Sequence, residues 1–93
     1  MTDYRIFETD EFRRNVRDLD TRQRSFVELK LSQYVYPQLR ARPHLGLNIK
    51  KLQGYQPATW RYRIGRFRVF YGIDDQKRIV NVLALDHRKD AYR

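Results

Sequence analysis

The first quarter of the chain changes from a strand-like pattern to a helical one. Residues 4–8 (YRIFE) fit the two-residue period of a short strand. Thr9 follows at a position suited to a helix N-cap. Phe12, Val16 and Leu19 then recur at the spacing of one helix face. The pattern predicts a strand followed directly by a short amphipathic helix.

A second helix is predicted after Asp20, which forms the pattern of a capping box with Gln23. A broad apolar stripe supports this helix and consists of Phe26, Val27, Leu29, Leu31 and Tyr34. Pro37 is expected to end it, and residues 37–51 are expected to form a loop or a short irregular strand. Because the junction at Asp20 is tight, the two helices should form an antiparallel hairpin.

Residues 60–71 (WRYRIGRFRVFY) predict a β-hairpin whose register can be worked out. A two-residue turn at Gly65 and Arg66, with glycine at the first central position of a type II′ turn, places Ile64 opposite Phe67. Paired residues share a face of the sheet. One face then carries only apolar side chains, namely Trp60, Tyr62, Ile64, Phe67, Val69 and Tyr71. The opposite face carries Arg61, Arg63, Arg68 and Phe70.

The last predicted strand, residues 79–85 (IVNVLAL), follows a turn at residues 74–77 and is apolar except at Asn81, as an interior strand would be. Val69 and Leu83 are both expected in the core. The length of 93 residues allows one domain, residues 1–93. The predicted fold class is α+β, in the order β-α-α-β-β-β, with a small antiparallel sheet and a helical hairpin packed on one face.

The net charge of +9 is concentrated in the middle of the chain. Residues 29–73 carry nine basic side chains and no acidic one, whereas the segments on either side are nearly neutral. Arginine outnumbers lysine by 15 to 5, which favours bidentate contact with phosphate or carboxylate. A polyanion or an acidic protein is therefore the expected partner. The alternative is a charge that serves solubility alone.

Composition also excludes several classes of protein. The chain has no cysteine and only two histidines, so neither a disulfide framework nor a zinc site is expected, and no metal or cofactor is predicted. No signal-peptide pattern opens the sequence, and no apolar run approaches the roughly 18 residues of a membrane span. A cytoplasmic protein without a membrane partner is expected.

The arginines of the predicted hairpin point to a phosphate ligand. Arg63 opposite Arg68 is a like-charge pair that costs up to about 1 kcal/mol. No acidic residue lies near these two or near Arg61 in the sequence. A bound phosphate would relieve the repulsion, and the Phe70 ring could pack on a base or sugar. Each arginine alone, in contrast, is typical of a solvated surface.

Cleavage of RNA is the catalysis that these residue types could support without a metal. The 2′-OH of RNA is an internal nucleophile, so the protein need only position it, neutralise charge and move protons. His87 and Tyr92 are the available proton handlers. Lys50 and Lys51 join Arg61, Arg63 and Phe70 as RNA-binding candidates.

Several of these segments resemble the RelE/ParE superfamily of bacterial type II toxins. The resemblance is carried by RFRVFY in the hairpin, by the closing HRKDAY and, more weakly, by KKLQG, and the element order extends it over the whole chain. It implies a bacterial cytoplasmic toxin bound by a cognate acidic antitoxin in a hetero-oligomer. In the RelE branch it implies a ribosome-dependent endoribonuclease that cleaves mRNA through the 2′-OH without metal.

The resemblance also assigns roles to residues. It implies that Arg68 contacts the scissile phosphate, that Arg88 is a second phosphate ligand and that Tyr92 lies near the reacting nucleotide. Arg61 and Arg63 stand where the best-known RelE enzymes have lysines, and an arginine cannot readily serve as a general base because it stays protonated. The general base and acid are therefore unassigned, with His87 as a candidate.

Two other readings of the same sequence remain open. A ParE-like toxin would inhibit DNA gyrase and lack the nuclease residues. A non-catalytic homologue would keep the basic face only to bind its antitoxin. Retention of Arg68, Arg88 and Tyr92 together favours the nuclease.

Overall fold

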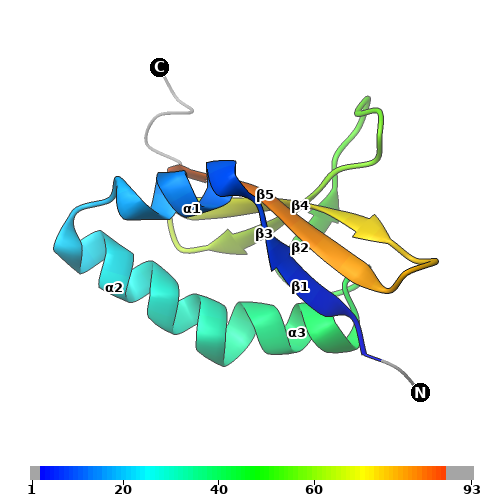
Figure 1. The fold of residues 1–93 in the computed structure, drawn as a ribbon, viewed down its shortest axis with the longest axis horizontal. Helices are drawn as coiled ribbons and strands as arrows, with labels where there is room; N and C mark the ends of the chain where they lie inside the picture. The colour runs from blue at the N-terminus through cyan, green and yellow to red at the C-terminus, as the bar shows by residue number, and fades with distance from the viewer. Residues whose placement is uncertain (1–2, 88–93) are drawn as a thin grey trace.

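The computed structural model describes residues 3–87 and has the α+β architecture expected from the sequence. The helical elements are α1 (Asp10–Arg17), α2 (Thr21–Lys30), the π-helical turn η1 (Leu31–Val35) and α3 (Tyr36–Ala41). The strands are β1 (Arg5–Glu8), β2 (Ile49–Lys51), β3 (Trp60–Ile64), β4 (Phe67–Asp74) and β5 (Ile79–His87). They form one five-stranded sheet in the order β1-β5-β4-β3-β2 (Figure 1). None of the helices described is long and apolar enough to cross a membrane.

The hairpin of β3 and β4 has the predicted register. Ile64 lies opposite Phe67, Arg63 opposite Arg68, and the remaining three pairs follow in sequence. Gly65 has a φ of 59°, as the first central residue of a type II′ turn requires. The turn therefore sends the apolar and the basic side chains of both strands to opposite faces of the sheet.

The sheet is mixed, and not purely antiparallel as expected. β2, β3, β4 and β5 pair antiparallel in series, but β1 pairs parallel with β5, with Arg5 opposite Ile79 and Glu8 opposite Val82. The short β2, which lies in the segment expected to be a loop or an irregular strand, forms the other edge. The pattern of β1 alone could not reveal its partner, because a parallel and an antiparallel strand share the same two-residue period.

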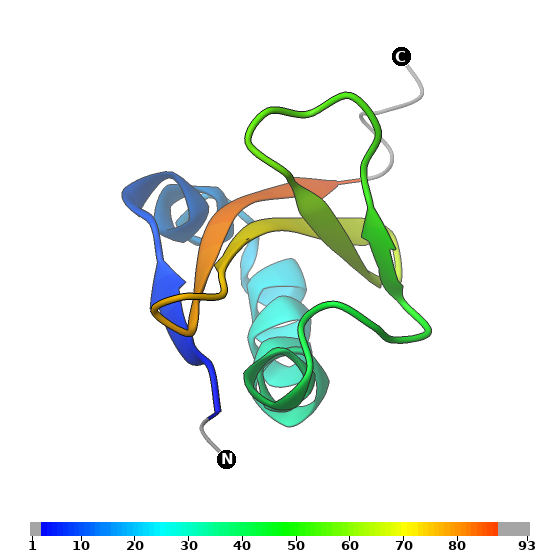
Figure 2. The ribbon, with the colours of Figure 1, turned by 90° about the vertical axis from the view of Figure 1, so that its right-hand side faces the viewer.

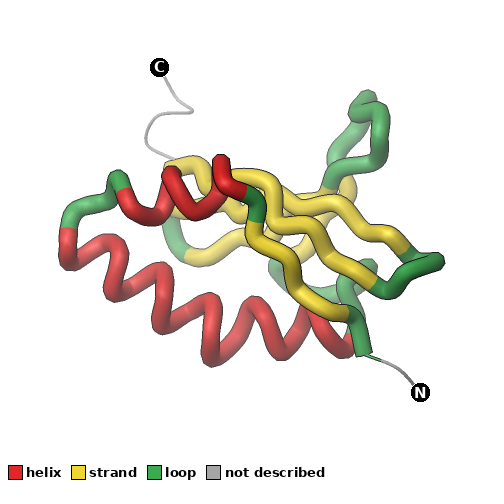
Figure 3. Tube along the Cα trace, in the orientation of Figure 1, coloured by secondary structure: helices red, strands yellow, loops and turns green. Residues whose placement is uncertain are grey.

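The second helix does not end at Pro37. Asp20 caps α2 as predicted, with its Oδ1 accepting a hydrogen bond of 2.8 Å from the Gln23 N–H. The helix then continues through η1 into α3, whose first turn contains Pro37 (Figure 3). In η1 the Tyr36 N–H bonds back to the Leu31 carbonyl. This wider turn ends two residues before the proline, so the helix accommodates a residue that lacks an N–H instead of stopping there.

The core lies between one face of the sheet and the helices. The sheet curves over α2 and α3, and of residues 3–87 it is the loop between β2 and β3 that rises above its other face (Figure 2). Val69, Tyr71, Val80 and Val82 are fully buried against the helices. Leu83 is not part of this core: it is 36% exposed and lies at a β-bulge of β5, where the pairing with β4 shifts by one residue.

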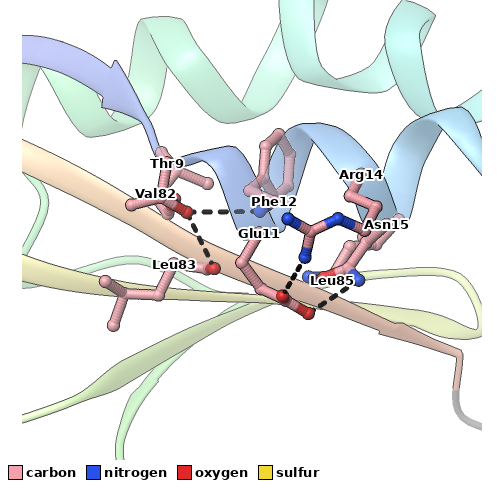
Figure 4. A network of polar contacts seen from close by, with 8 residues as sticks. All are labelled: Thr9, Glu11, Phe12, Arg14, Asn15, Val82, Leu83 and Leu85. Atoms are coloured by element: carbon pink, nitrogen blue, oxygen red, sulfur yellow. Dashed lines mark hydrogen bonds and ion pairs between the residues drawn. The ribbon is translucent and has the colours of Figure 1, made fainter.

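Helix α1 is attached to the second half of β5, beyond the point where β1 ends (Figure 4). The Thr9 hydroxyl caps α1 by accepting from the Phe12 N–H at 3.2 Å, and it donates to the Val82 carbonyl at 2.9 Å. One turn later, the Asn15 side chain accepts a hydrogen bond of 2.9 Å from the Leu85 N–H. The N-cap residue Thr9 and the α1 side chain of Asn15 thus take the place of a strand partner for β5.

Aspartate substitutions at Val69 and Leu83 should have opposite outcomes. Val69→Asp buries an unpaired charge and should remove the cooperative folded state, whereas Leu83→Asp places the charge at a partly exposed bulge and should leave a folded protein. Circular dichroism and thermal melting distinguish the two results. Equal loss of structure in both variants would contradict the placement of Leu83 outside the core, on the open face of the sheet.

The Thr9 hydroxyl should be a measurable source of stability. Thr9→Ala removes both the cap of α1 and its link to β5, and should lower the free energy of unfolding by about 1–2 kcal/mol. Thr9→Ser retains the hydroxyl and is the matched control. Urea denaturation of the two variants checks this expectation, and an alanine variant as stable as the serine variant would contradict it.

Candidate nucleic-acid interface

The basic side chains of the hairpin gather on the face of the sheet that the helices leave open. Arg61 and Arg63 on β3 share this face with Arg68 on β4, because Arg63 is paired with Arg68. Phe70 lies opposite Arg61 on the same side. We call these four residues the arginine face. Its members come from two strands joined by one tight turn, so their relative positions are fixed by backbone pairing and not by a loop.

Arg68 is held in place from two sides. Its guanidinium forms an ion pair and a hydrogen bond with the carboxylate of Asp86, which lies directly opposite on β5. Its Cζ also lies 5.6 Å from the centre of the Phe70 ring. The expectation that no acid lies near the arginines therefore holds in the sequence but is wrong in space. Asp86 neutralises one charge and orients the guanidinium that the sequence singles out.

Arg61 and Arg63 have no such carboxylate among the residues that the structure describes. Arg61 donates a hydrogen bond of 3.2 Å from Nη1 to the Asn48 carbonyl. Its pKa is lowered from the usual arginine value, first by desolvation and then by the charges of Arg63 and Arg68. An arginine stays protonated at neutral pH. The repulsion is thus present in the folded protein, and a bound anion would relieve it.

The two lysines of β2 lie on different faces of the sheet. Lys50 is opposite Arg61 and so extends the arginine face. Lys51 is opposite Trp60, and its Nζ lies 5.7 Å from the centre of the Trp60 ring. The sequence alone does not separate the two, because three residues are too few to display a strand alternation. Of the two predicted RNA-binding lysines, the structure brings only Lys50 to the arginines.

The structure separates two of the predicted catalytic residues and does not describe the other two. His87 ends β5 opposite Phe67, with the two ring centres 4.6 Å apart. Phe67 is buried on the helix-covered face, so His87 and Arg68 lie on opposite sides of the sheet. Arg88 and Tyr92 lie outside the described residues. Within residues 3–87, no group of three or more His, Asp or Glu side chains could hold a metal ion.

A second polar cluster lies at the turn between β4 and β5. The Tyr4 hydroxyl donates to Oδ1 of Asp75 at 2.5 Å, and Nε2 of His44 lies 2.9 Å from the same oxygen. The hydrogen bond from Tyr4, with the charges of His44 and Arg78 as smaller causes, lowers the pKa of Asp75 below its usual value. This cluster fixes the start of the chain to the turn and gives His44 a partner that the sequence did not indicate.

The fold and the site together define a class of protein. It is a small, basic α+β domain with an arginine-rich sheet face that the helices leave open. A family model, the ParE toxin of type II toxin–antitoxin systems (parDE), matches residues 9–92. The chain belongs to this family. A search of curated proteins found no significant match.

Solved structures of RelE toxins share the fold. The RelBE2 toxin–antitoxin complex of Mycobacterium tuberculosis matches with 26% identity and a TM-score of 0.71, covering 95% of this chain and 94% of that chain. The intact RelBE complex of Escherichia coli matches with 21% identity and a TM-score of 0.63, covering 90% and 95%. The RelE–RelB complex of Pyrococcus horikoshii matches with 23% identity and a TM-score of 0.59, covering 95% of this chain and 97% of that chain. The protein is thus a type II toxin of the RelE/ParE superfamily, as its sequence suggested.

The salt dependence of binding to single-stranded polyuridine tests the arginine face. Arg61→Ala should weaken binding and reduce the slope of log K against log salt by about 0.7 for each phosphate that the variant no longer neutralises. Asp86→Asn should strengthen binding, because it removes an anion that competes for Arg68. Lys77→Ala, in the turn between β4 and β5, is the control. If Lys77→Ala weakens binding as much as Arg61→Ala, binding depends on the total charge of the protein, and the arginine face is not a specific RNA-binding surface.

Proposed function

We propose that this toxin is a ribosome-dependent, metal-independent endoribonuclease that cleaves mRNA through the 2′-OH and so inhibits translation. The observation that carries the proposal is the arginine face, where Arg68 is oriented by Asp86 and accompanied by two arginines without carboxylate partners among the described residues. Preorganised positive charge of this kind stabilises the extra negative charge of a phosphoryl transition state. A bacterial cytoplasmic location, with ribosome and mRNA as partners, belongs to the same proposal.

The chemistry assigns distinct tasks to the RNA and to the protein. The 2′-oxygen attacks the adjacent phosphorus while its proton passes to a base. The bond to the 5′-oxygen of the next nucleotide then breaks, and that oxygen takes a proton. The products are a 2′,3′-cyclic phosphate and a free 5′-hydroxyl. Arg61, Arg63 and Arg68 would neutralise the phosphorane, and holding the nucleophile in line with the leaving group supplies the remaining acceleration.

The proton transfers fall to residues at the end of the chain. We assign Tyr92 to the reacting nucleotide and Arg88 to a second contact with the phosphate, both from the resemblance to RelE toxins. His87 is kept as a further candidate because it adjoins Arg88 in the sequence. Its ring lies against Phe67 on the other side of the sheet from Arg68, which makes Tyr92 the stronger assignment.

Inhibition of DNA gyrase is the second candidate function. It is favoured by the family model, whose description is that of a ParE toxin. In that case the arginine face would contact gyrase or its DNA, and no residue would act on a phosphodiester. The third reading, a homologue that only binds its antitoxin, would predict neither activity.

A cognate antitoxin is the proposed protein partner. The solved structures that share the fold include complexes in which a RelE toxin is bound to RelB. An acidic antitoxin would complement the charge of +9 and form a hetero-oligomer with the toxin. An antitoxin that covered the arginine face would prevent RNA from binding there and would so inhibit the toxin directly.

Cleavage of mRNA on purified ribosomes tests the function. The wild-type toxin should give defined cuts by primer extension, and Arg68→Ala should reduce the cleavage rate by about 100-fold or more. Its melting temperature should change little, since the ion pair that is lost with Asp86 is partly exposed and surface ion pairs contribute up to about 1 kcal/mol. Arg22→Ala, on the exposed surface of α2, is the matched control. Intact mRNA together with inhibited supercoiling by gyrase would overturn the nuclease and support the second candidate.

A further inference from the structure

A hollow lies beside the arginine face, on the same side of the sheet. The loop at residues 52–59, between β2 and β3, overhangs the sheet here (Figure 2). The hollow has a volume of about 370 Å³, and its lining includes Pro57, Ala58, Gly72, Asn81 and Leu83. This volume falls at the lower end of the range for small-molecule sites. The hollow is therefore large enough to accept a compact ring.

Gly72 keeps the floor of the hollow open. Its backbone does not have the positive φ that Gly54 and Gly65 have, so its conformation does not call for glycine. A Cβ at this position would meet only the Ala58 carbonyl oxygen, at 3.9 Å. A side chain is thus sterically allowed at Gly72, and a larger one would occupy the hollow. Because Gly72 has no side chain, there is room under the loop. The backbone conformation at this position does not require glycine.

Asn81 supplies the amide in a lining whose other polar side chains are the hydroxyls of Thr9 and Thr59. It lies in register between Gly72 on β4 and Phe7 on β1, so the three residues form one row across the open face. Asn81 interrupts an apolar strand, and its side chain makes no hydrogen bond to any residue that the structure describes. Phe7 is 58% exposed on the same face. An amide and an aromatic ring are therefore both available to a ligand.

We propose that this hollow binds one nucleobase of the RNA, with a preference for adenine. The inference rests on the proposed function, because it extends the same RNA-binding surface. Gly72 is four residues from Arg68 on β4, a separation of about 13 Å that one extended single strand can bridge. The Asn81 amide offers one donor and one acceptor side by side, the arrangement that pairs with the donor and acceptor of adenine. Phe7 lies beside Asn81 on β1 and outside the lining of the hollow, so its exposed ring is a surface on which a neighbouring base would stack.

Binding of two short RNAs tests the subsite. The probes are 2′-O-methyl heptanucleotides, which cannot be cleaved, one of uridine alone and one with a single central adenine. Fluorescence anisotropy with the wild-type protein should show about fivefold or more tighter binding of the adenine probe. Asn81→Leu should bring the ratio of the two affinities close to one. Gly72→Val, which fills the hollow and favours a strand, should do the same.

The matched control is Gln33→Leu, which removes an exposed amide from the helical side of the protein and should keep the wild-type ratio. Thermal melting confirms that each variant is folded. Equal affinity of the wild-type protein for both probes, or an unchanged ratio in folded Asn81→Leu and Gly72→Val, would overturn the subsite and leave the nuclease intact. Failure of the wild-type protein to bind either probe would overturn both the subsite and the RNA-binding surface on which it rests.

Discussion

The pairing of β3 with β4 is the constraint on which the rest of the structure depends. Gly65 adopts the positive φ that a two-residue turn needs, and this turn places Arg63 opposite Arg68. Because side chains alternate between faces, a slip of one residue would send arginines into the core and aromatic rings into solvent. Core and candidate site are therefore not independent: the register that buries Val69 and Tyr71 also gathers the arginines.

The β-bulge of β5 is the second constraint, and it could not be predicted from the sequence. Near the turn, Tyr71 is opposite Val82, and continuing that register would bring Leu85 opposite Arg68. The extra residue at Leu83 shifts the pairing, so that Asp86 meets Arg68 instead. Nothing in the apolar run IVNVLAL marks where an extra residue is accommodated. The sequence therefore does not reveal the partner of the central arginine, although it predicts both hairpins.

The parallel pairing of β1 escaped the sequence-based expectations for the same reason, because it too belongs to long-range structure. Local signals predicted the Asp20 cap, the Thr9 cap and the hairpin turn, because each depends on residues close together in the chain. The parallel pairing of β1 joins segments more than 70 residues apart, and a local pattern does not record it. The prediction that Pro37 ends the second helix was wrong for a different reason. Proline interrupts a regular α-helix, but here a π-helical turn precedes it.

The charge on the open face has a consequence for how this toxin would be controlled. Asp86 compensates Arg68 alone, and the repulsion between Arg61 and its neighbours persists in the free protein. Any polyanion that covers the face therefore gains the same electrostatic relief, whether it is RNA or an acidic protein. Charge alone cannot distinguish RNA from an acidic protein. Discrimination between these two ligands must therefore come from the shape of the surface next to the arginines. The hollow under the loop at residues 52–59 is such a shape, and in the proposed RNA complex it would take a base from the single strand. An antitoxin would then need only to compete for the arginines, because displacing the proposed phosphate contacts would also release the base that is proposed to bind at Asn81.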